Sequence, residues 1–275
     1  MIEPGEPGGN PLDFSGRVVV VTGGARGVGR GIAEAFLEAG AAVVVCGRTV
    51  PPDDELPRGA GAAASFVPAD VRDPEQATGL IRAAVERHGR LDVLVNNAGG
   101  SPEVAAADAS PRFVAAIVGL NLLGPMYCAQ AANAVMQEQN SGGSIVNIGS
   151  LSGVRPSPGT AAYGAAKAGL LNATKSLAME WAPKVRVNCV VAGLIATEAA
   201  HDFYGGEEGI KAVARTVPLG RLGTPADVAG VCLFLASPLA GYVTGAAIEA
   251  HGGGERPPFQ AAARRTDHDQ QQPLH

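Results

Sequence analysis

A tyrosine and a lysine four residues apart are the pair in this chain best suited to acid–base chemistry. Tyr163 and Lys167 stand in the segment YGAAK, early in a stretch with helical spacing. Positions i and i+4 of a helix face the same way, so both side chains would enter one pocket. A free tyrosine has a pKa of about 10, and a nearby ammonium group favours the phenolate. The spacing therefore predicts a tyrosine general acid or base whose pKa Lys167 lowers.

A glycine-rich turn near the start of the chain could bind a nucleotide. The β-branched run 17–22 leads into TGGARGVG (22–29), and a helical pattern follows at once. Glycines allow a tight turn and let the backbone approach a pyrophosphate, while the helix N-terminus supplies N–H groups and a partial positive charge. A plain strand–helix turn is the alternative. Between a first strand and a first helix, the turn predicts a dinucleotide-binding loop.

The end of the next apolar run indicates which dinucleotide is preferred. This run ends in CGRT (46–49), with Arg48 and no acidic residue at the turn. An acidic residue there binds a ribose 2′-hydroxyl, whereas an arginine accommodates a 2′-phosphate. Arg26, inside the glycine turn, offers a second guanidinium for the same phosphate. We therefore predict that NADP(H) is preferred, with NAD(H) possible.

Short β-branched runs alternate with longer helical segments along the chain. The sequence predicts strands at 17–22, 42–46, 64–68, 91–96, 143–148, 185–191 and 246–250. It predicts helices at 29–39, 74–88, 111–139, 160–182, 209–217 and 225–236. Continuous apolar runs are typical of strands buried on both faces of a parallel sheet. The alternation predicts one α/β domain, a doubly wound parallel sheet in three layers, with any ligand at the carboxyl ends of the strands.

Composition and charge limit the partners. We predict a flexible lead-in at 1–14, one catalytic domain at 15–254 and a polar tail at 255–275. A formal charge of −5 gives no basic face for nucleic acid or an anionic membrane. No signal peptide is predicted at the start, and no apolar run is expected to reach the roughly 18 residues of a membrane span. A cytoplasmic location is therefore expected.

The four cysteines and five histidines give little indication of a metal or redox site. The cysteines are scattered without a C-x-x-C pair, and three stand in apolar runs. Buried free thiols in a reducing compartment are the favoured interpretation, with a redox or metal role as the alternative. The histidines form no spaced pair, and we predict no metal site. His251 is expected to be structural or to lie in an interface.

Taken together, these segments resemble the classical short-chain dehydrogenase/reductase family over about residues 15–254. The resemblance rests on T-G-x-x-x-G-x-G (22–29), N-N-A-G (96–99), Asn121, Ser150 and Y-x-x-x-K (163–167), in that order. It implies a catalytic group of Asn121, Ser150, Tyr163 and Lys167. Ser150 would donate a hydrogen bond to the substrate oxygen, Tyr163 would transfer the proton, and Asn121 would hold a water linked to Lys167. The alternative for Asn121 is a buried residue at a helix kink near Gly124.

The resemblance also implies which residues hold the cofactor, with Asp70 expected to reach the adenine amino group. Asn96 and its neighbours are as much structural as cofactor-binding. The chain departs from the family pattern at Ala192, where proline is common before Gly193, and at His251, where aspartate is common. The expected cofactor set is Thr22, Gly23, Arg26, Gly27, Val28, Gly29, Arg48, Asp70, Val71, Asn96, Ala98, Gly99, Tyr163, Lys167, Gly193, Ile195 and Thr197.

By the same resemblance, the chain would transfer a hydride between NADP(H) and a carbonyl or secondary alcohol. A lid is expected at 198–217, including His201, Phe203 and Tyr204, and a pocket at 100–104, 151–158 and Leu194. These mostly apolar or small residues favour a neutral substrate, such as a 3-oxoacyl thioester, a ketone or a cyclic alcohol. The alternatives are an NAD-dependent alcohol dehydrogenase of the same family, a non-catalytic NADP(H) sensor, and a lyase or isomerase. A homotetramer or homodimer through the helices at 111–139 and 160–182 and the C-terminal strand is implied.

Overall fold

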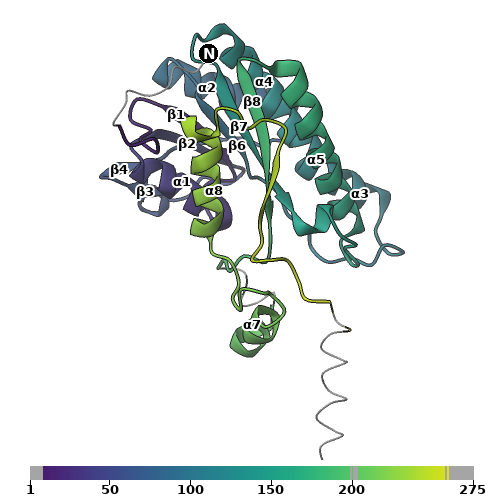
Figure 1. Ribbon diagram of the computed structural model, residues 1–275. Helices are drawn as coiled ribbons and strands as arrows, with labels where there is room; N and C mark the ends of the chain where they lie inside the picture. Colours follow the sequence, from purple (N-terminus) through teal and green to yellow (C-terminus); the bar gives the residue numbers. More distant parts are fainter. Residues whose placement is uncertain (1–8, 199, 201–203, 258, 260–275) are drawn as a thin grey trace, which may run out of the picture.

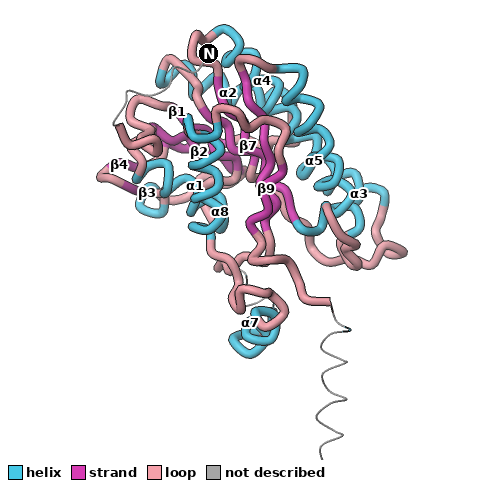
Figure 2. Tube along the Cα trace, in the orientation of Figure 1, coloured by secondary structure: helices cyan, strands magenta, loops and turns pink. Residues whose placement is uncertain are grey.

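A sheet of seven parallel strands forms the centre of the molecule (Figures 1 and 2). The computed structural model describes residues 9–198, 200, 204–257 and 259. Every neighbouring pair of strands is parallel. The strands lie in the order β5 (Ser65–Pro68), β2 (Ala42–Gly47), β1 (Val18–Thr22), β6 (Val93–Asn96), β7 (Gly143–Ser150), β8 (Val185–Ala192) and β9 (Ala247–Ala250). The predicted doubly wound α/β fold is confirmed.

The central strands are buried along their whole length. All five residues of β1, all four of β6 and all eight of β8 are buried. The register of β1 on β2 sets Val19 against Val43 on one face and Val20 against Val44 on the other, so β-branched side chains meet on both faces. Such runs cannot alternate with polar residues, because helices cover both sides of the sheet.

Helices form a layer on each face of the sheet (Figure 1). α1 (Gly27–Glu38) and α8 (Pro225–Ala236) pack together on one face, where Phe36 and Leu235 are fully buried. α2 (Pro74–His88), α4 (Gly124–Glu138) and α5 (Ala161–Trp181) cover the other face, where Leu80 and Met136 are fully buried. The result is the predicted three-layer arrangement around two apolar cores.

The helix predicted at 111–139 is interrupted near its middle. α3 (Pro111–Val118) and α4 are joined by a π-helical turn, η2 (Gly119–Leu123), which contains Asn121. An 18-residue window of the combined helix Pro111–Glu138 has a mean hydropathy of 1.5, so by length and composition alone this helix could cross a membrane. The expectation that no run reaches this length was therefore wrong. In this fold the helix packs on the sheet and on α2 and α5, and 33% of the apolar window is buried there.

Short elements between the major ones were not predicted. β3 (Arg58–Gly59) and β4 (Ala62–Ala63) form an antiparallel hairpin whose two turn residues, Ala60 and Gly61, both have positive φ. Two-residue strands are too short to show a periodicity. The 3-10 helices η1 (Asp53–Glu55), η3 (Leu151–Gly153) and η4 (Pro238–Ala240) were missed for the same reason. α7 (Gly206–Ala214) begins three residues before the helix predicted at 209.

The last residue of the predicted lead-in packs on the domain instead of lying outside it. Phe14, assigned to the lead-in, is buried, and its ring meets Phe36 edge-on at 5.0 Å. Its N–H donates to the Ala39 carbonyl at the end of α1. Most of the tail at 255–275, and the lid residues His201 and Phe203, lie outside the described residues.

The four cysteines are free and buried, as the favoured interpretation predicts. Burial raises the pKa of the Cys46 and Cys189 thiols to about 11 and raises the pKa of the other two further. Neutral buried thiols pack as small apolar groups. Within the described part of the chain, no three His, Cys, Asp or Glu residues form a group that could hold a metal ion.

Candidate active site

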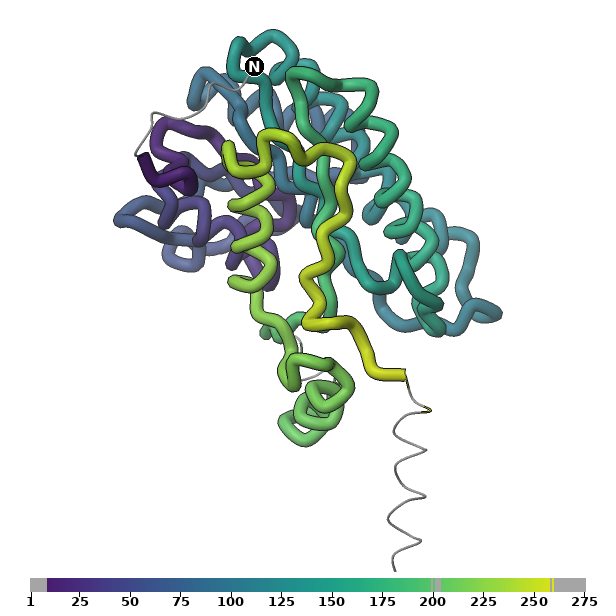
Figure 3. The backbone as a smooth tube through the Cα atoms, in the orientation of Figure 1, coloured from purple at the N-terminus to yellow at the C-terminus, as the bar shows by residue number. Residues whose placement is uncertain are grey.

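The predicted site residues follow the carboxyl ends of four neighbouring strands. β1 lies between β2 and β6, so the direction in which strands are added reverses at β1 and β6. Open α/β sheets bind ligands at such a switch point. The glycine turn follows β1, residues 97–99 follow β6, Ser150 ends β7 and Gly193 follows β8. Figure 3 shows the segment around α7 and the chain after β9 leaving the sheet at this same edge.

The glycine turn after β1 has the geometry that a pyrophosphate needs. Gly23 and Gly27 have φ values of 64° and 55°, where a side chain would strain the backbone. A Cβ on Gly29 would lie 2.4 Å from both the Asn97 Nδ2 and the Gly23 carbonyl oxygen. α1 starts at Gly27, and its N-cap residue, Arg26, makes no side-chain capping bond. The first N–H groups of α1 are therefore left without a side-chain cap, which fits a phosphate of the cofactor.

The buried Thr22 and the half-buried Asn97 hold this turn against the end of β6. The Thr22 hydroxyl accepts hydrogen bonds from the N–H groups of Asn97 and Ala98, each at 3.0 Å. The Asn97 amide donates to the carbonyls of Thr22 at 2.9 Å and Gly23 at 3.3 Å. Thr22 was expected to touch the cofactor, but its hydroxyl is engaged within the protein. Asn97 was not in the predicted set, because spacing alone does not show which of two adjacent asparagines turns toward the glycines.

Asn96 has a structural position in the core between β6 and β7. It is 1% exposed, and its amide donates to the Pro125 carbonyl and to Asn147 Oδ1 at 2.9 Å. Asn147 in turn donates to Thr174 on α5. This network joins two strands and two helices beneath the site. Asn96 was expected to be as much structural as cofactor-binding, and its contacts within the protein are structural ones.

The residues expected to recognise the adenosine end lie on exposed turns. Arg26 and Arg48 are exposed at the ends of the loops after β1 and β2. Asp70 follows β5, and its carboxylate accepts from Arg72 Nε at 2.9 Å. The Arg72 hydrogen bond is the main reason that the pKa of Asp70 lies below its usual value, and Arg48 acts in the same direction. Arg72 was not predicted, although it stands two residues after Asp70.

Ser150 and Tyr163 meet at the end of β7. A hydrogen bond joins their side chains, and the Ser150 Oγ also accepts from the Ser152 N–H at 3.1 Å. The turn after Ser150 packs tightly on the start of α5, since a Cβ on Gly164 would lie 2.8 Å from the Ser152 carbonyl oxygen. Burial raises the pKa of Tyr163, and the Ser150 hydrogen bond opposes this shift.

Lys167 lies beside Tyr163 but is itself poorly solvated. Its side chain is buried, its Nζ is 5.7 Å from the centre of the Tyr163 ring, and it donates to the Ile148 carbonyl at 2.8 Å. Burial lowers the pKa of Lys167 to about 8. The expectation that Lys167 brings the pKa of Tyr163 down is wrong for the chain alone: the ammonium does not offset the loss of solvation that the phenolate would suffer.

Asn121 and Gly99 adjoin Lys167. The Asn121 Oδ1 accepts from the Gly100 N–H at 2.9 Å, and its Nδ2 donates to the carbonyls of Gly100 and Ile117. Both amide hydrogens are used, which leaves one acceptor position on Oδ1. A Cβ on Gly99 would lie 2.7 Å from Asn121 Oδ1 and 3.2 Å from Lys167 Nζ, so only glycine leaves this space open. Asn121 thus combines the expected position near Lys167 with its alternative, a structural role in an interrupted helix.

The segment after β8 closes the far side of the site. Gly193 packs directly against His251, where a Cβ would approach the His251 Cβ to 2.6 Å. His251 Nε2 pairs with Glu249 at 2.9 Å, which agrees with a structural role. Ile195 pairs with Gly223 through an isolated bridge, and Thr197 lies against Gly27 of the glycine turn. Val71 is buried and packs against Gly124, whereas Val28 is partly buried against the α1 core.

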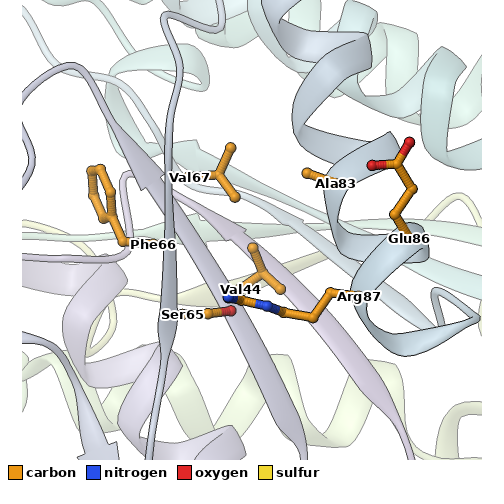
Figure 4. Close-up of a pocket in the computed structure, with 7 residues that line it drawn as sticks. All are labelled: Val44, Ser65, Phe66, Val67, Ala83, Glu86 and Arg87. Carbon is orange, nitrogen blue, oxygen red and sulfur yellow. The ribbon is translucent and has the colours of Figure 1, made fainter.

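A hollow of about 400 Å³ lies apart from these residues (Figure 4). Its walls come from β5, from Val44 of the neighbouring β2 and from the C-terminal part of α2, which contributes Glu86 and Arg87. α2 starts near the carboxyl ends of the strands and runs back toward their amino ends. The hollow therefore lies toward the amino ends of the strands, whereas Ser150 and Tyr163 lie at the carboxyl ends. The site is defined by the polar contacts described above and not by this hollow.

The site combines an uncapped helix N-terminus on a glycine turn with a serine at a strand end and with a tyrosine and a buried lysine on the following helix. This combination is typical of Rossmann-type oxidoreductases. A family model described as enoyl-(acyl carrier protein) reductase matches residues 23–255. The chain belongs to the short-chain dehydrogenase/reductase family. The resemblance found in the sequence is thus confirmed, and the protein is an oxidoreductase of a family that acts on CH–OH or C=O groups with NAD(P)(H).

Relatives with different substrates match nearly the whole chain. An L-rhamnose 1-dehydrogenase (NAD(P)(+)) of Azotobacter vinelandii is 39% identical, over 86% of this chain and 96% of that protein. A 3-oxoacyl-[acyl-carrier-protein] reductase of Chlamydia pneumoniae is 37% identical, over 88% and 98%. The crystal structure of a candidate short-chain alcohol dehydrogenase from Sinorhizobium meliloti 1021 is 40% identical, covers 89% of this chain and 98% of that one, and has a TM-score of 0.81.

Proposed function

We propose that this chain is an NADP(H)-preferring oxidoreductase that interconverts a carbonyl compound and a secondary alcohol, with Tyr163 as the general acid–base. The observation that carries the proposal is the hydrogen-bonded pair of Ser150 and Tyr163 beside the buried Lys167. When bound, the nicotinamide cofactor would supply or accept the hydride. A sensor of the cofactor would need none of these three side chains.

Each of the four proposed catalytic residues has a separate task. Ser150 donates to the substrate oxygen as negative charge develops on it, and Tyr163 exchanges the proton with that oxygen. Lys167 places a positive charge below the tyrosine ring and holds the ribose of the cofactor. The free acceptor position of Asn121 binds a water that connects Lys167 to solvent.

The protonation state of Tyr163 favours carbonyl reduction at neutral pH. Burial raises its pKa above the usual value, so the phenol stays protonated and can donate. In the oxidation direction the same group must first lose a proton, which becomes easier as the pH rises. The reduction direction is therefore expected to be the faster one near neutral pH.

Arg48 is proposed to select NADP(H). The Arg48→Ala variant is expected to raise the KM for NADPH by about 10- to 100-fold and to leave the KM for NADH nearly unchanged, because a hydrogen bond between charged groups contributes about 1.5–3 kcal/mol. Steady-state kinetics with both cofactors measure this difference. Arg82→Ala removes an exposed arginine of α2 and is the matched control. An equal rise for both cofactors would mean that Arg48 does not contact the 2′-phosphate.

The substrate is proposed to be a small carbonyl or alcohol compound. The relatives named above act on a sugar and on a 3-oxoacyl thioester, so the family assignment leaves the substrate open. A 3-oxoacyl thioester, a ketone and a cyclic alcohol stay the first compounds to test. A cytoplasmic location is part of the proposal, and no partner of nucleic acid or membrane is invoked.

We also propose a homotetramer or homodimer built through α4 and α5. Met179 on α5 is 84% exposed and Leu123 at the start of α4 is 39% exposed, an arrangement that leaves apolar side chains in water in a single chain. Light scattering after size-exclusion chromatography is expected to give the mass of two or four chains. Met179→Glu is expected to lower it, and a single-chain mass for the unmodified protein would refute the assembly.

A further inference from the structure

An ion pair joins the turn after Ser150 to the chain after β9, two segments that are far apart in sequence. Arg155 Nε lies 2.7 Å from Glu255 Oε2, and Arg155 Nη2 donates to Glu255 Oε1 at 2.9 Å. The two residues are 100 positions apart. The side chains are 37% and 30% exposed, so the pair is neither buried in the core nor fully in water.

Arg155 belongs to the turn that carries Ser150. Its N–H donates to the carbonyl of Leu151, the residue after Ser150, at 3.1 Å. The same turn packs on α5 next to Tyr163, through the contact between Ser152 and Gly164. The backbone of Arg155 is thus fixed relative to both proposed catalytic hydroxyls, while its guanidinium extends to a different part of the chain.

Glu255 comes from the chain after β9, which contacts the region around α7. The N–H of the next residue, Arg256, donates to the Thr216 carbonyl at 2.8 Å, just after α7. Glu255 also helps to raise the pKa of Tyr204, which stands just before α7. Three segments therefore meet at the pair: the turn after Ser150, the region around α7 and the chain after β9.

Resting on the proposed function, we infer that Arg155 determines substrate specificity by binding a carboxylate group of the substrate. In the chain alone, Glu255 stands where that carboxylate would bind. A guanidinium presents N–H donors that match a carboxylate. Glu255 accepts a hydrogen bond from one of them, Nη2, and its other oxygen lies 2.7 Å from Nε. A partly exposed ion pair contributes little free energy, so a carboxylate tethered to a carbonyl at Ser150 and Tyr163 can displace Glu255. The substrate class is an oxo or hydroxy carboxylic acid.

The binding experiment separates this inference from the chemistry. Methyl-ketone carboxylic acids, in a series whose spacer grows by one methylene at a time, are titrated by calorimetry into the enzyme saturated with NADP⁺. The methyl ester of each acid is titrated in parallel. An oxo compound and an oxidised cofactor cannot exchange a hydride, so only binding is measured. For at least one spacer length, the acid is expected to bind about tenfold more tightly than its ester.

Variants then assign this preference to Arg155. Arg155→Met is expected to remove the preference by weakening the acid about tenfold and leaving the ester unchanged, and Arg155→Lys to restore part of it. Glu255→Gln is expected to strengthen acid binding several-fold, because it removes the internal competitor. Arg82→Met disrupts an exposed ion pair on α2 and should change neither ligand. Binding of the ester by Arg155→Met shows that this variant is folded.

Three results would overturn the inference: no acid preference at any spacer length, no binding by any acid, or a preference that Arg155→Met retains. Reduction of the esters with NADPH tests the proposed function separately. Ester reduction without an acid preference would leave the oxidoreductase proposal intact and remove the role of Arg155. An Arg155-dependent acid preference without reduction of any compound would support the binding role of Arg155 and contradict the proposed reduction.

Discussion

Tyr163→Phe is expected to reduce turnover by about a thousandfold or more while leaving cofactor affinity nearly unchanged. Phenylalanine keeps the ring that packs over Lys167 but lacks the hydroxyl that exchanges the proton and bonds to Ser150. General acid–base catalysis contributes about 10²–10⁴-fold in rate, and the oriented hydroxyl also stabilises the developing oxyanion. Steady-state rates of ketone reduction, together with fluorescence titration of NADPH, measure the two effects.

The control for this variant is another tyrosine outside the site. Tyr242 is fully exposed beyond η4, so Tyr242→Phe changes the same chemical group without touching Ser150 or Lys167. Its rate and cofactor affinity should match those of the unmodified protein. Normal turnover by Tyr163→Phe would exclude the tyrosine as the proton carrier, and lost cofactor binding would mean that its hydroxyl supports the nucleotide site instead.

The sheet and its helices could be predicted because their causes are local. Runs such as VVVVT (18–22) have no polar residue to place on a solvent face, so they fit only a covered strand. The order of strands and helices then determines the edge at which the ligand binds, through the right-handed crossover. Ser150 ends one of these strands, so its position at that edge could be predicted, whereas its pairing with Tyr163 was implied by the family resemblance.

The contacts that were missed depend on side chains from distant segments. Spacing places Arg155 in a mostly apolar loop, and nothing in that loop indicates that Glu255 binds it. The expectation of a neutral substrate followed from composition, whereas the ion pair is visible only after β9 and the turn after Ser150 are brought together. The engagement of Asp70 by Arg72 was missed for another reason, since a single aspartate after a strand can serve several partners.

The sign of a pKa shift is harder to predict than the position of the group. The Tyr163 and Lys167 spacing correctly predicts their proximity, and a lysine in water would stabilise a phenolate. Lys167 is buried and Tyr163 is half-buried, however, and each loses hydration that the other does not replace. Desolvation outweighs attraction here, because the Nζ is 5.7 Å from the ring centre and bonds to the Ile148 carbonyl.

Because its charge is buried, Lys167 is expected to lower the stability of the folded protein although it is needed for activity. Its pKa falls from 10.5 to about 8, and a shift of this size, at about 1.4 kcal/mol for each unit, corresponds to roughly 3 kcal/mol of destabilisation at neutral pH. Lys167→Met removes the charge and fills a similar volume, at the cost of the bond to Ile148. We expect the variant to be inactive and more stable than the unmodified protein by on the order of 1–3 kcal/mol.

The pH dependence identifies the cause of this difference. Lys167 is charged in both the folded and unfolded chains below its folded pKa of about 8, so the full cost of burying the charge is present there. As the pH rises from about 8 toward 10.5, the folded lysine loses its proton first, and the unmodified protein gains stability that Lys167→Met cannot gain. The difference between the two proteins in their free energy of urea unfolding should therefore be largest near neutral pH and shrink in alkaline solution.

Lys175, exposed on the same helix, gives the control Lys175→Met, for which little change in stability is expected. A constant difference across this range, or a less stable Lys167→Met at neutral pH, would show that the hydrogen bond to Ile148 outweighs the desolvation of the ammonium group.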